Sequence, residues 1–407
     1  MGAYLDLPAE NAGLKEFYDG QKVENLAYDK NPLLAMMPKN PNATGKVIPI
    51  PIIYEVSQGA SNNFANAQGN QTPMLLAELF LTLKPDYSIA TIGHQAALAA
   101  MDGKGGFINF SKKFIDIAVQ SCALRQATAM YRAGTGSRGA ISSIAAGVIT
   151  LTNAADVSQF GINQTLQANS TDGGSPRAAL GYVIARSVRA GTITVSSTAL
   201  QGAAGSPTSW AANDFLLVQG DNNASMSGLS AHLPSTDPAS TDNFYGCNRS
   251  PDSRLYGLYY NGVGQSIEEA LIDDAMLVAR EKADPKHFMT NYGSYAALVK
   301  AMGTRREFVD WKSEDATFGF RGAKIQGPNG VIECFPDRNC QAATGFLLQL
   351  DTWTLYSLNE VPHIFNWGDG MEVLRLGNGD AYETRTGAFS NMGTSAPGWN
   401  SQIALQS

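Results

Sequence analysis

The chain is poor in charge. Only 16% of its 407 residues are Asp, Glu, Lys or Arg, against about a quarter in an average globular domain. The net charge is −7, so the chain lacks the excess of Lys and Arg that a nucleic-acid-gripping protein needs. Surfaces buried between subunits are depleted in charge, and this composition therefore fits a chain that associates with others. It fits a polar, loop-rich protein equally well.

Cysteine motifs and long apolar runs are also missing. The four cysteines, Cys122, Cys247, Cys334 and Cys340, show no C-x-x-C pair and no metal-like spacing, so we expect free thiols. No apolar run approaches the roughly 20 residues of a membrane span. Residues 1–8 have neither the basic start nor the apolar core of a secretion signal. The sequence therefore predicts a soluble protein made in the cytoplasm.

No set of residues indicates catalysis or ligand binding. The pattern G-x-G-x-x-G occurs at residues 134–139, but it follows a predicted helix, whereas a phosphate-binding loop of this type follows a strand and opens a helix. His94, His232, His287 and His363 are scattered without a paired spacing. The sequence therefore predicts no enzyme, no metal site and no cofactor site, although residues far apart in the chain could still meet in three dimensions.

The chain does contain two β-rich runs on either side of a polar segment. Residues 47–56 and 79–92 are rich in isoleucine, leucine and valine, which strands favour. Residues 57–72 between them have many turn formers and no apolar periodicity, which predicts a mobile tip. Prolines at positions 49, 51 and 85 remove ladder donors, so both arms are predicted to be edge strands. A two-stranded ribbon cannot bury its own faces, and we expect another chain to supply the missing surface.

A long amphipathic helix is predicted next, from an N-cap at Asn109 to a stop at Gly134. Its apolar residues recur at spacings of three, four and seven: Phe110, Phe114, Ile117, Ala118, Leu124 and Met130. At 1.5 Å per residue the helix would span roughly 35 Å. Cys122 within it is predicted to be a small buried side chain. Taken alone, the helix also fits the core helix of a single domain.

Short strands are predicted after a glycine-rich segment at residues 134–140, which is interpreted as a flexible break. Five strands follow, at residues 147–152, 162–167, 180–186, 192–196 and 214–219. Their regular spacing predicts a small closed barrel or a sandwich. Because the flanking segments are mixed α and β, this region is interpreted as an insertion.

Mixed structure is predicted for the remainder of the chain. A capping box formed by Ser266 and Glu269 opens a helix that runs through Lys282. A strand at 287–290 and a helix at 294–302, stopped by Gly303, come next. The predicted terminal strands lie at residues 346–350, 353–357, 371–376 and 387–390.

The order of these segments resembles the major capsid proteins of tailed bacteriophages, the family with the HK97 fold. An arm, an extended ribbon, a long helix, an inserted β-region, capped helices and terminal strands follow one another over nearly the whole chain. Individual motifs resemble the family less specifically than the order of the elements does. They are Asn31-Pro-Leu-Leu34, Lys286-His-Phe-Met-Thr290 with Tyr295-Ala-Ala-Leu298, and Asp380-Ala-Tyr382 to Ala396-Pro-Gly-Trp399. The resemblance therefore rests on the order of the elements.

The resemblance implies an α+β chain with an HK97-like fold. Its segments would be an N-terminal arm (1–45), an extended loop or E-loop (46–92), a peripheral domain with the spine helix (93–140), a β-rich, barrel-like insertion domain (141–235), an axial domain (236–330), and return strands of the axial and peripheral domains (331–407). Contacts between subunits are expected from the E-loop residues Val47, Ile50, Ile52, Gln58, Asn62, Phe64 and Asn70. Packing of the spine helix is expected from Phe110, Phe114, Ile117 and Leu124.

The implied function is self-assembly, through hexamers and pentamers, into an icosahedral or prolate shell around packaged double-stranded DNA that is contacted weakly and non-specifically. Scaffold, portal and decoration proteins are further candidate partners, and no membrane is expected. The protein would be made and assembled in the host cytoplasm and would reside in the virion. Two hypotheses stay open beside it: another virion protein, such as a tail tube or a receptor-binding β-protein, and a hydrolase with a β-sandwich domain.

Overall fold

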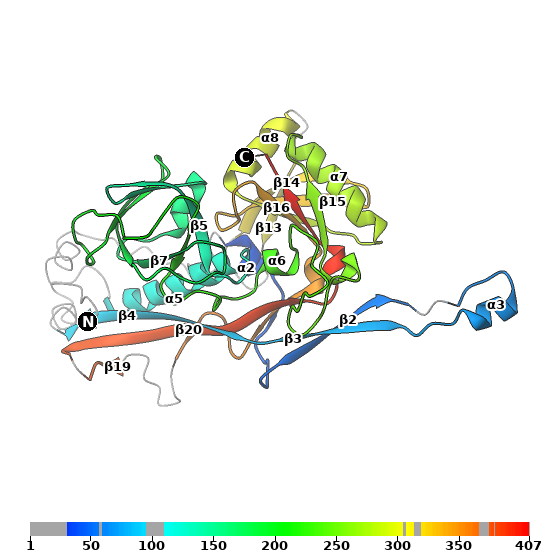
Figure 1. Ribbon diagram of the computed structural model, residues 1–407, viewed down its shortest axis with the longest axis horizontal. Helices are drawn as coiled ribbons and strands as arrows, with labels where there is room; N and C mark the ends of the chain where they lie inside the picture. The colour runs from blue at the N-terminus through cyan, green and yellow to red at the C-terminus, as the bar shows by residue number, and fades with distance from the viewer. Residues whose placement is uncertain are drawn as a thin grey trace.

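Two open sheets, one closed barrel and a projecting two-stranded hairpin make up the described part of the chain (Figure 1). The computed structural model describes residues 31–56, 59–94, 110–303, 307–312, 319–365, 374–377 and 379–406, with side chains described outside 110–117, 307–312 and 319–321. In Figure 1 the barrel and the larger sheet stand above a long base, and the hairpin extends from one end of that base.

The base is a six-stranded sheet organised by its longest strand, β20 (Ala381–Thr394). The other strands are β1 (Lys39–Asn40), β4 (Lys84–Gly93), β17 (Trp353–Ser357), β18 (His363–Ile364) and β19 (Leu374–Arg375). β4 pairs antiparallel with β20 over its whole length and with no other described strand, so Pro85 sits at a sheet edge, as predicted. The strand predicted at 387–390 is the middle of the much longer β20.

The predicted long helix is confirmed as α5 (Phe110–Ala129), which lies along β4 and β20 (Figure 1). The predicted N-cap, Asn109, lies outside the described residues. Ala118, Cys122 and Ala127 are at most 2% exposed, and such small side chains let the helix backbone approach the sheet closely. Cys122 is buried, as predicted, and this burial, with a smaller contribution from Asp86, raises the pKa of its thiol to about 12.

The predicted insertion is confirmed as a closed barrel with the strand order β10-β5-β6-β9-β8-β7. Its strands are β5 (Ser137–Ala145), β6 (Val148–Leu151), β7 (Thr165–Asn169), β8 (Gly181–Ser187), β9 (Thr192–Ser196) and β10 (Phe215–Val218), and the short helix η1 (Ala154–Gln159) lies between β6 and β7. Prediction missed β5, because its first residues fall in the glycine-rich segment interpreted as a flexible break. Closure needs this strand, which joins β10 to β6.

The second open sheet has seven strands in the order β11-β21-β16-β12-β15-β14-β13. These are β11 (Leu258–Asn261), β12 (His287–Thr290), β13 (Glu307–Lys312), β14 (Gly319–Gly327), β15 (Gly330–Pro336), β16 (Thr344–Leu348) and β21 (Ser401–Ala404). Helices α7 (Ile267–Arg280) and α8 (Tyr292–Met302) pack on it. The predicted capping box is confirmed, since Ser266 and Glu269 each accept the other's backbone N–H.

The main core lies where the base, the seven-stranded sheet and α5 meet. A short helix, α2 (Pro32–Met36), inserts there, with Leu33 and Leu34 at most 1% exposed. This part of the expected N-terminal arm (1–45) is therefore helical and buried, and residues 1–30 lie outside the described residues. The remaining short helices are α6 (Leu229–His232), η2 (Ser253–Leu255), η3 (Leu350–Thr352) and η4 (Pro397–Trp399).

The hairpin consists of β2 (Ile48–Glu55) and β3 (Leu75–Leu81), which pair with each other alone among the described strands. Pro49 and Pro51 therefore lie in an edge strand, as predicted. The second arm was predicted to run on through Ile92, but it ends at Leu81, because the following strand β4 joins the base sheet instead. The predicted mobile tip contains a helix, α3 (Phe64–Gly69), which Asn63 caps by accepting the N–H of Ala65.

Candidate functional site

One face of the hairpin packs on its own subunit. The antiparallel register places Ile50 opposite Leu79 and Ile48 opposite Leu81, and alternate residues of a strand share a face. The buried members of this inner face are at most 3% exposed and contact Cys247 and Leu255; they are Ile50, Ile52, Leu79 and Leu81. The base of the hairpin is therefore anchored by ordinary core packing within the subunit.

Polar contacts fix the direction in which the hairpin leaves the body. The N–H of Phe80 donates to the carbonyl of Tyr245 at 2.9 Å, and the guanidinium of Arg254 lies 2.7 Å from the carboxylate of Glu55 at the end of β2. Gly246 has φ +83°, and a Cβ there would lie 2.9 Å from the ring of Phe80, so glycine is required for this approach. These contacts tie both strands to residues 245–254.

The opposite face of the hairpin is apolar and exposed. Ile53 and Leu76 are paired partners in the register and are 60% and 54% exposed, and Phe80 on the same face is 45% exposed. We call these three residues the outer strip. At the tip, Phe64 in α3 is 83% exposed. Apolar side chains gathered on one exposed face are uncommon in a monomer and mark an interaction surface.

The residues expected to contact neighbouring subunits fall in different environments. Asn62, Phe64 and Asn70 are exposed at the tip, where Asn70 is the C-cap of α3. Val47 is half-buried just before β2, and Gln58 lies outside the described residues.

Two of the expected contact residues need correction. Ile50 and Ile52 are 3% and 1% exposed, because both point to the inner face and pack within their own subunit. Ile53 and Leu76, which the sequence reasoning did not select, occupy the exposed face instead. The signal was present in the sequence, since adjacent residues of a strand point to opposite faces, but only the fold shows which face is covered.

The residues expected to pack the spine helix are described only in part. Phe110, Phe114 and Ile117 lie in α5, with side chains outside the described set, and Leu124 is half-buried. Sequence reasoning missed the buried polar contacts at the C-terminal end of this helix. The hydroxyl of Tyr131, which follows the helix, donates to Asp337 at 2.9 Å, and burial raises the pKa of Asp337 to about 6.

The barrel is joined to the rest of the protein through buried polar groups. Thr128 of α5 donates to the side-chain oxygen of Gln159 at 2.8 Å, and the amide nitrogen of Gln159 donates to the carbonyl of Arg338 at 3.0 Å. Arg132 pairs with Asp156 of η1 at 3.1 Å. These contacts link the barrel to both the spine helix and the seven-stranded sheet. No local sequence motif marks them, because the partners are far apart in the chain.

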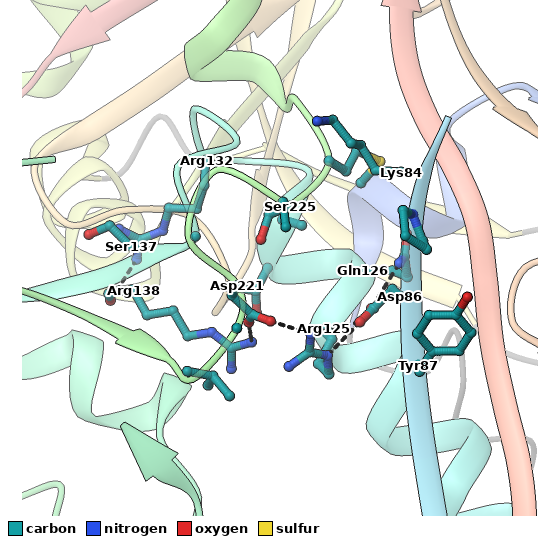
Figure 2. Close-up of a pocket in the computed structure, with 18 of the residues that line it drawn as sticks. Lys84, Asp86, Tyr87, Arg125, Gln126, Arg132, Ser137, Arg138, Asp221 and Ser225 are labelled. Carbon is teal, nitrogen blue, oxygen red and sulfur yellow. Dashed lines mark hydrogen bonds and ion pairs between the residues drawn. The ribbon is translucent and has the colours of Figure 1, made fainter. Parts of the chain in front are cut away.

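A cavity of about 450 Å³ lies between the barrel, α5 and β4. Figure 2 shows Arg125 between two carboxylates, with Asp86 of β4 on one side and Asp221 on the other. Arg125 lies 2.7 Å from Asp86 and 3.0 Å from Asp221, and Arg138 lies 3.2 Å from Asp221. Burial opposes the charge of Arg125, but the two carboxylates outweigh it and raise the pKa of Arg125 above its ordinary value.

The described residues contain no group of three or more His, Cys, Asp or Glu that could hold a metal ion. The histidines serve local contacts: Nδ1 of His94 lies 2.9 Å from Asp380, and Nε2 of His232 lies 2.9 Å from the carbonyl of Met392. Burial lowers the pKa of His232 to about 4. In the described part of the chain, no helix combines the length and the apolar character needed to cross a membrane.

Comparison with known proteins identifies the fold. Residues 212–368 match the family model described as SU10 major capsid protein. The capsid asymmetric unit of cyanophage A-1(L) is similar, with a TM-score of 0.56 at 12% identity over 98% of this chain and 98% of that one. The capsid of a native GTA particle gives a TM-score of 0.51 at 9% identity over 97% of this chain and 94% of that one. Among curated proteins, none matches the sequence.

The fold is therefore the HK97-like α+β fold of capsid shell proteins, as the order of the segments predicted. The family match over residues 212–368 agrees with this fold, and the two findings together support a structural shell role for the chain. The alternative of a tail-tube or receptor-binding protein is not favoured.

Proposed function

We propose that the chain assembles with copies of itself, through hexamers and pentamers, into an icosahedral or prolate shell that encloses packaged double-stranded DNA. The observation that carries the proposal is the hairpin, whose base is packed on its own subunit while its outer strip and tip remain exposed. A neighbouring subunit would cover these apolar groups. Repeated interfaces of ordinary size, roughly 800 Å² per partner, would then hold a shell that no single contact could maintain.

In this proposal each segment has a separate task. Residues 1–45 would be the N-terminal arm and the hairpin within residues 46–92 the E-loop, while α5 and the base sheet, including β4, would form the peripheral domain. The seven-stranded sheet with α7 and α8 would be the axial domain near capsomer centres, and the barrel an insertion domain. Contact residues would be Val47, Gln58, Asn62, Phe64 and Asn70, with Ile53 and Leu76 in place of Ile50 and Ile52.

The further partners in this proposal are scaffold, portal and decoration proteins. DNA would be held weakly and non-specifically, which agrees with the net charge of −7. The protein would be made and assembled in the host cytoplasm before it becomes part of the virion.

Electron microscopy of the purified full-length chain tests the proposal. Closed polyhedral shells are expected, whereas stacked rings, fibres or persistent monomers would contradict it. The double variant Ile53→Asp, Leu76→Asp should fold but give no closed shells, because it places charges in the proposed interface. Val188→Asp is the matched control, since Val188 is 58% exposed on the barrel, and it should assemble normally. Normal shells from the double variant would exclude the outer strip as an interface.

A further inference from the structure

The cavity shown in Figure 2 has more cationic than anionic side chains in its wall. Its lining includes four cations, Lys84, Arg125, Arg132 and Arg138, but only two carboxylates, Asp86 and Asp221. A third carboxylate, Asp156, pairs with Arg132 from outside the lining. The four cations therefore face three carboxylates in all, which leaves one positive charge at the cavity without a carboxylate to balance it.

Two guanidinium groups share one carboxylate deep in this wall. Arg125 lies 3.0 Å from Oδ1 of Asp221, and Arg138 lies 3.2 Å from Oδ2 of the same residue. The side chain of Arg138 is only 9% exposed. Burial, and after it the charge of Arg125, lowers the pKa of Arg138 to about 10. Arg138 is therefore held charged in a place where positive charge is incompletely balanced.

Two further donors at the cavity lack strong acceptors. The ammonium group of Lys84 donates to the carbonyl of Asn223 at 3.5 Å, and no carboxylate among the described residues forms an ion pair with it. The Nε of Arg132 is buried and has no hydrogen-bond partner in the described part of the chain. An unpaired buried donor is costly, but this Nε has no accessible surface, so Lys84 is the donor at the cavity that a ligand could reach.

We infer that this cavity binds a phosphate group, held by Lys84 and the exposed edges of the arginine cluster. Arg and Lys are the side chains that bind phosphate oxygens best, because they supply several charged donors. A volume of about 450 Å³ lies within the range of small-ligand sites. The phosphate group would be free phosphate or belong to the backbone of a nucleic acid.

A bound phosphate group would also strengthen the joint between the barrel and the base. Lys84 belongs to β4 and Arg125 to α5, whereas Arg138 belongs to the barrel strand β5. An anion among them would therefore neutralise cations from both units. A phosphate group bound there would add to the direct contacts that already hold the barrel on the spine helix.

Thermal unfolding and titration calorimetry of the full-length chain test the site. Sodium phosphate is compared with sodium chloride at equal ionic strength, and a short oligonucleotide without terminal phosphates is tested in parallel. Saturable binding of inorganic phosphate, with a raised Tm, is expected if free phosphate is the ligand. Binding of the oligonucleotide alone would assign the site to backbone phosphates. No effect of either beyond that of chloride would overturn the inference.

Variants locate the binding. Lys84→Met should weaken the affinity for the phosphate group roughly tenfold, the loss of about one charge-assisted hydrogen bond. Lys300→Met is the matched control, because Lys300 is exposed on α8, and it should leave the affinity unchanged.

Ser225→Glu puts a carboxylate into the cavity lining and should abolish phosphate binding and the rise in Tm. Ser143→Glu changes an exposed residue of the barrel and should retain both. Equal binding by Lys84→Met and Lys300→Met would place the phosphate elsewhere.

Discussion

The barrel and the hairpin are both made of short antiparallel strands rich in aliphatic residues, but they bury these residues in different ways. The six strands of the barrel close on themselves, and Ile149, Val183 and Phe160 are 0% exposed inside it. The hairpin has two strands and only one covered face, so Ile53 and Leu76 remain in solvent. Closure makes the first region self-sufficient, whereas the second keeps an exposed apolar face that we propose a neighbouring subunit covers.

This difference separates folding from assembly within one chain. Substitutions in the barrel core should change the free energy of unfolding of the single subunit. Substitutions on the outer strip and the tip should leave that free energy nearly unchanged and alter contacts between subunits.

Removing a large side chain from the barrel core should have the largest effect. Phe160→Ala should lower the free energy of unfolding by about 3–5 kcal/mol, because it removes buried surface and leaves a cavity. The matched change at the tip, Phe64→Ala, should cost less than about 0.5 kcal/mol, since Phe64 is 83% exposed. Urea unfolding of the unassembled subunit measures both. Equal losses would show that the tip is part of the subunit's own core.

Raising the pH should destabilise the subunit body, with an effect of intermediate size. Asp274 in α7 is fully buried, accepts a hydrogen bond from Ser401 at 2.5 Å, and has one oxygen without a partner in the described residues. Burial raises its pKa to about 7. Because the folded state binds the proton more tightly, this contribution is complete below about pH 4 and is lost as the pH rises through 7, by about 2–3 kcal/mol between pH 5 and 8.

The variant Asp274→Asn isolates that contribution. It keeps the shape of the side chain and cannot ionise, so its unfolding free energy should fall less than the wild type's between pH 5 and 8. Asp337, whose pKa is raised to about 6 by burial, should supply part of the slope that remains. Residues 57–72 of the hairpin contain no titratable side chain, so this tip should not contribute. An unchanged slope in the variant would contradict the assignment to Asp274.

Local sequence patterns were sufficient to predict the elements whose structure is set by residues close together in the chain. The capping box at Ser266 and Glu269, the helical spacing of α5 and the repeated strands of the barrel were all predicted, because each follows from residues within a few positions. β5 was missed because Gly134, Gly136 and Gly139 favour a loop locally, while pairing with β6 and β10 makes the segment a strand.

Features that depend on residues far apart in the chain could not be predicted from the sequence. The sequence predicted a hairpin that needs another chain to cover it, but it did not show which face the subunit itself covers. That face is set by Cys247 and Leu255, nearly 200 residues away in the chain. The cavity beside Arg125 likewise brings together Asp86, Asp221 and Arg138, which share no motif. Periodicity defines the two faces of a strand, and only tertiary packing decides which of them is buried.

The smallest effect on folding should come from deleting the hairpin tip, and this gives the sharpest contrast with the barrel. Replacing residues 57–72 by a two-residue Asn-Gly turn removes α3 with its Phe64, and the described residues of this segment, 59–72, are exposed or half-buried. The inner face at Ile50 and Leu79 stays intact, so the Tm of the unassembled subunit should change by less than about 2 °C. Shell formation, followed by light scattering and electron microscopy, should nevertheless fail, because the deleted tip would no longer contact the neighbouring subunit.

The full-length Ser143→Glu variant serves as a control that changes an exposed residue without touching the hairpin. Complete shells from the shortened chain would show that the outer strip alone joins the subunits, whereas an unfolded subunit would show that the tip stabilises its own chain.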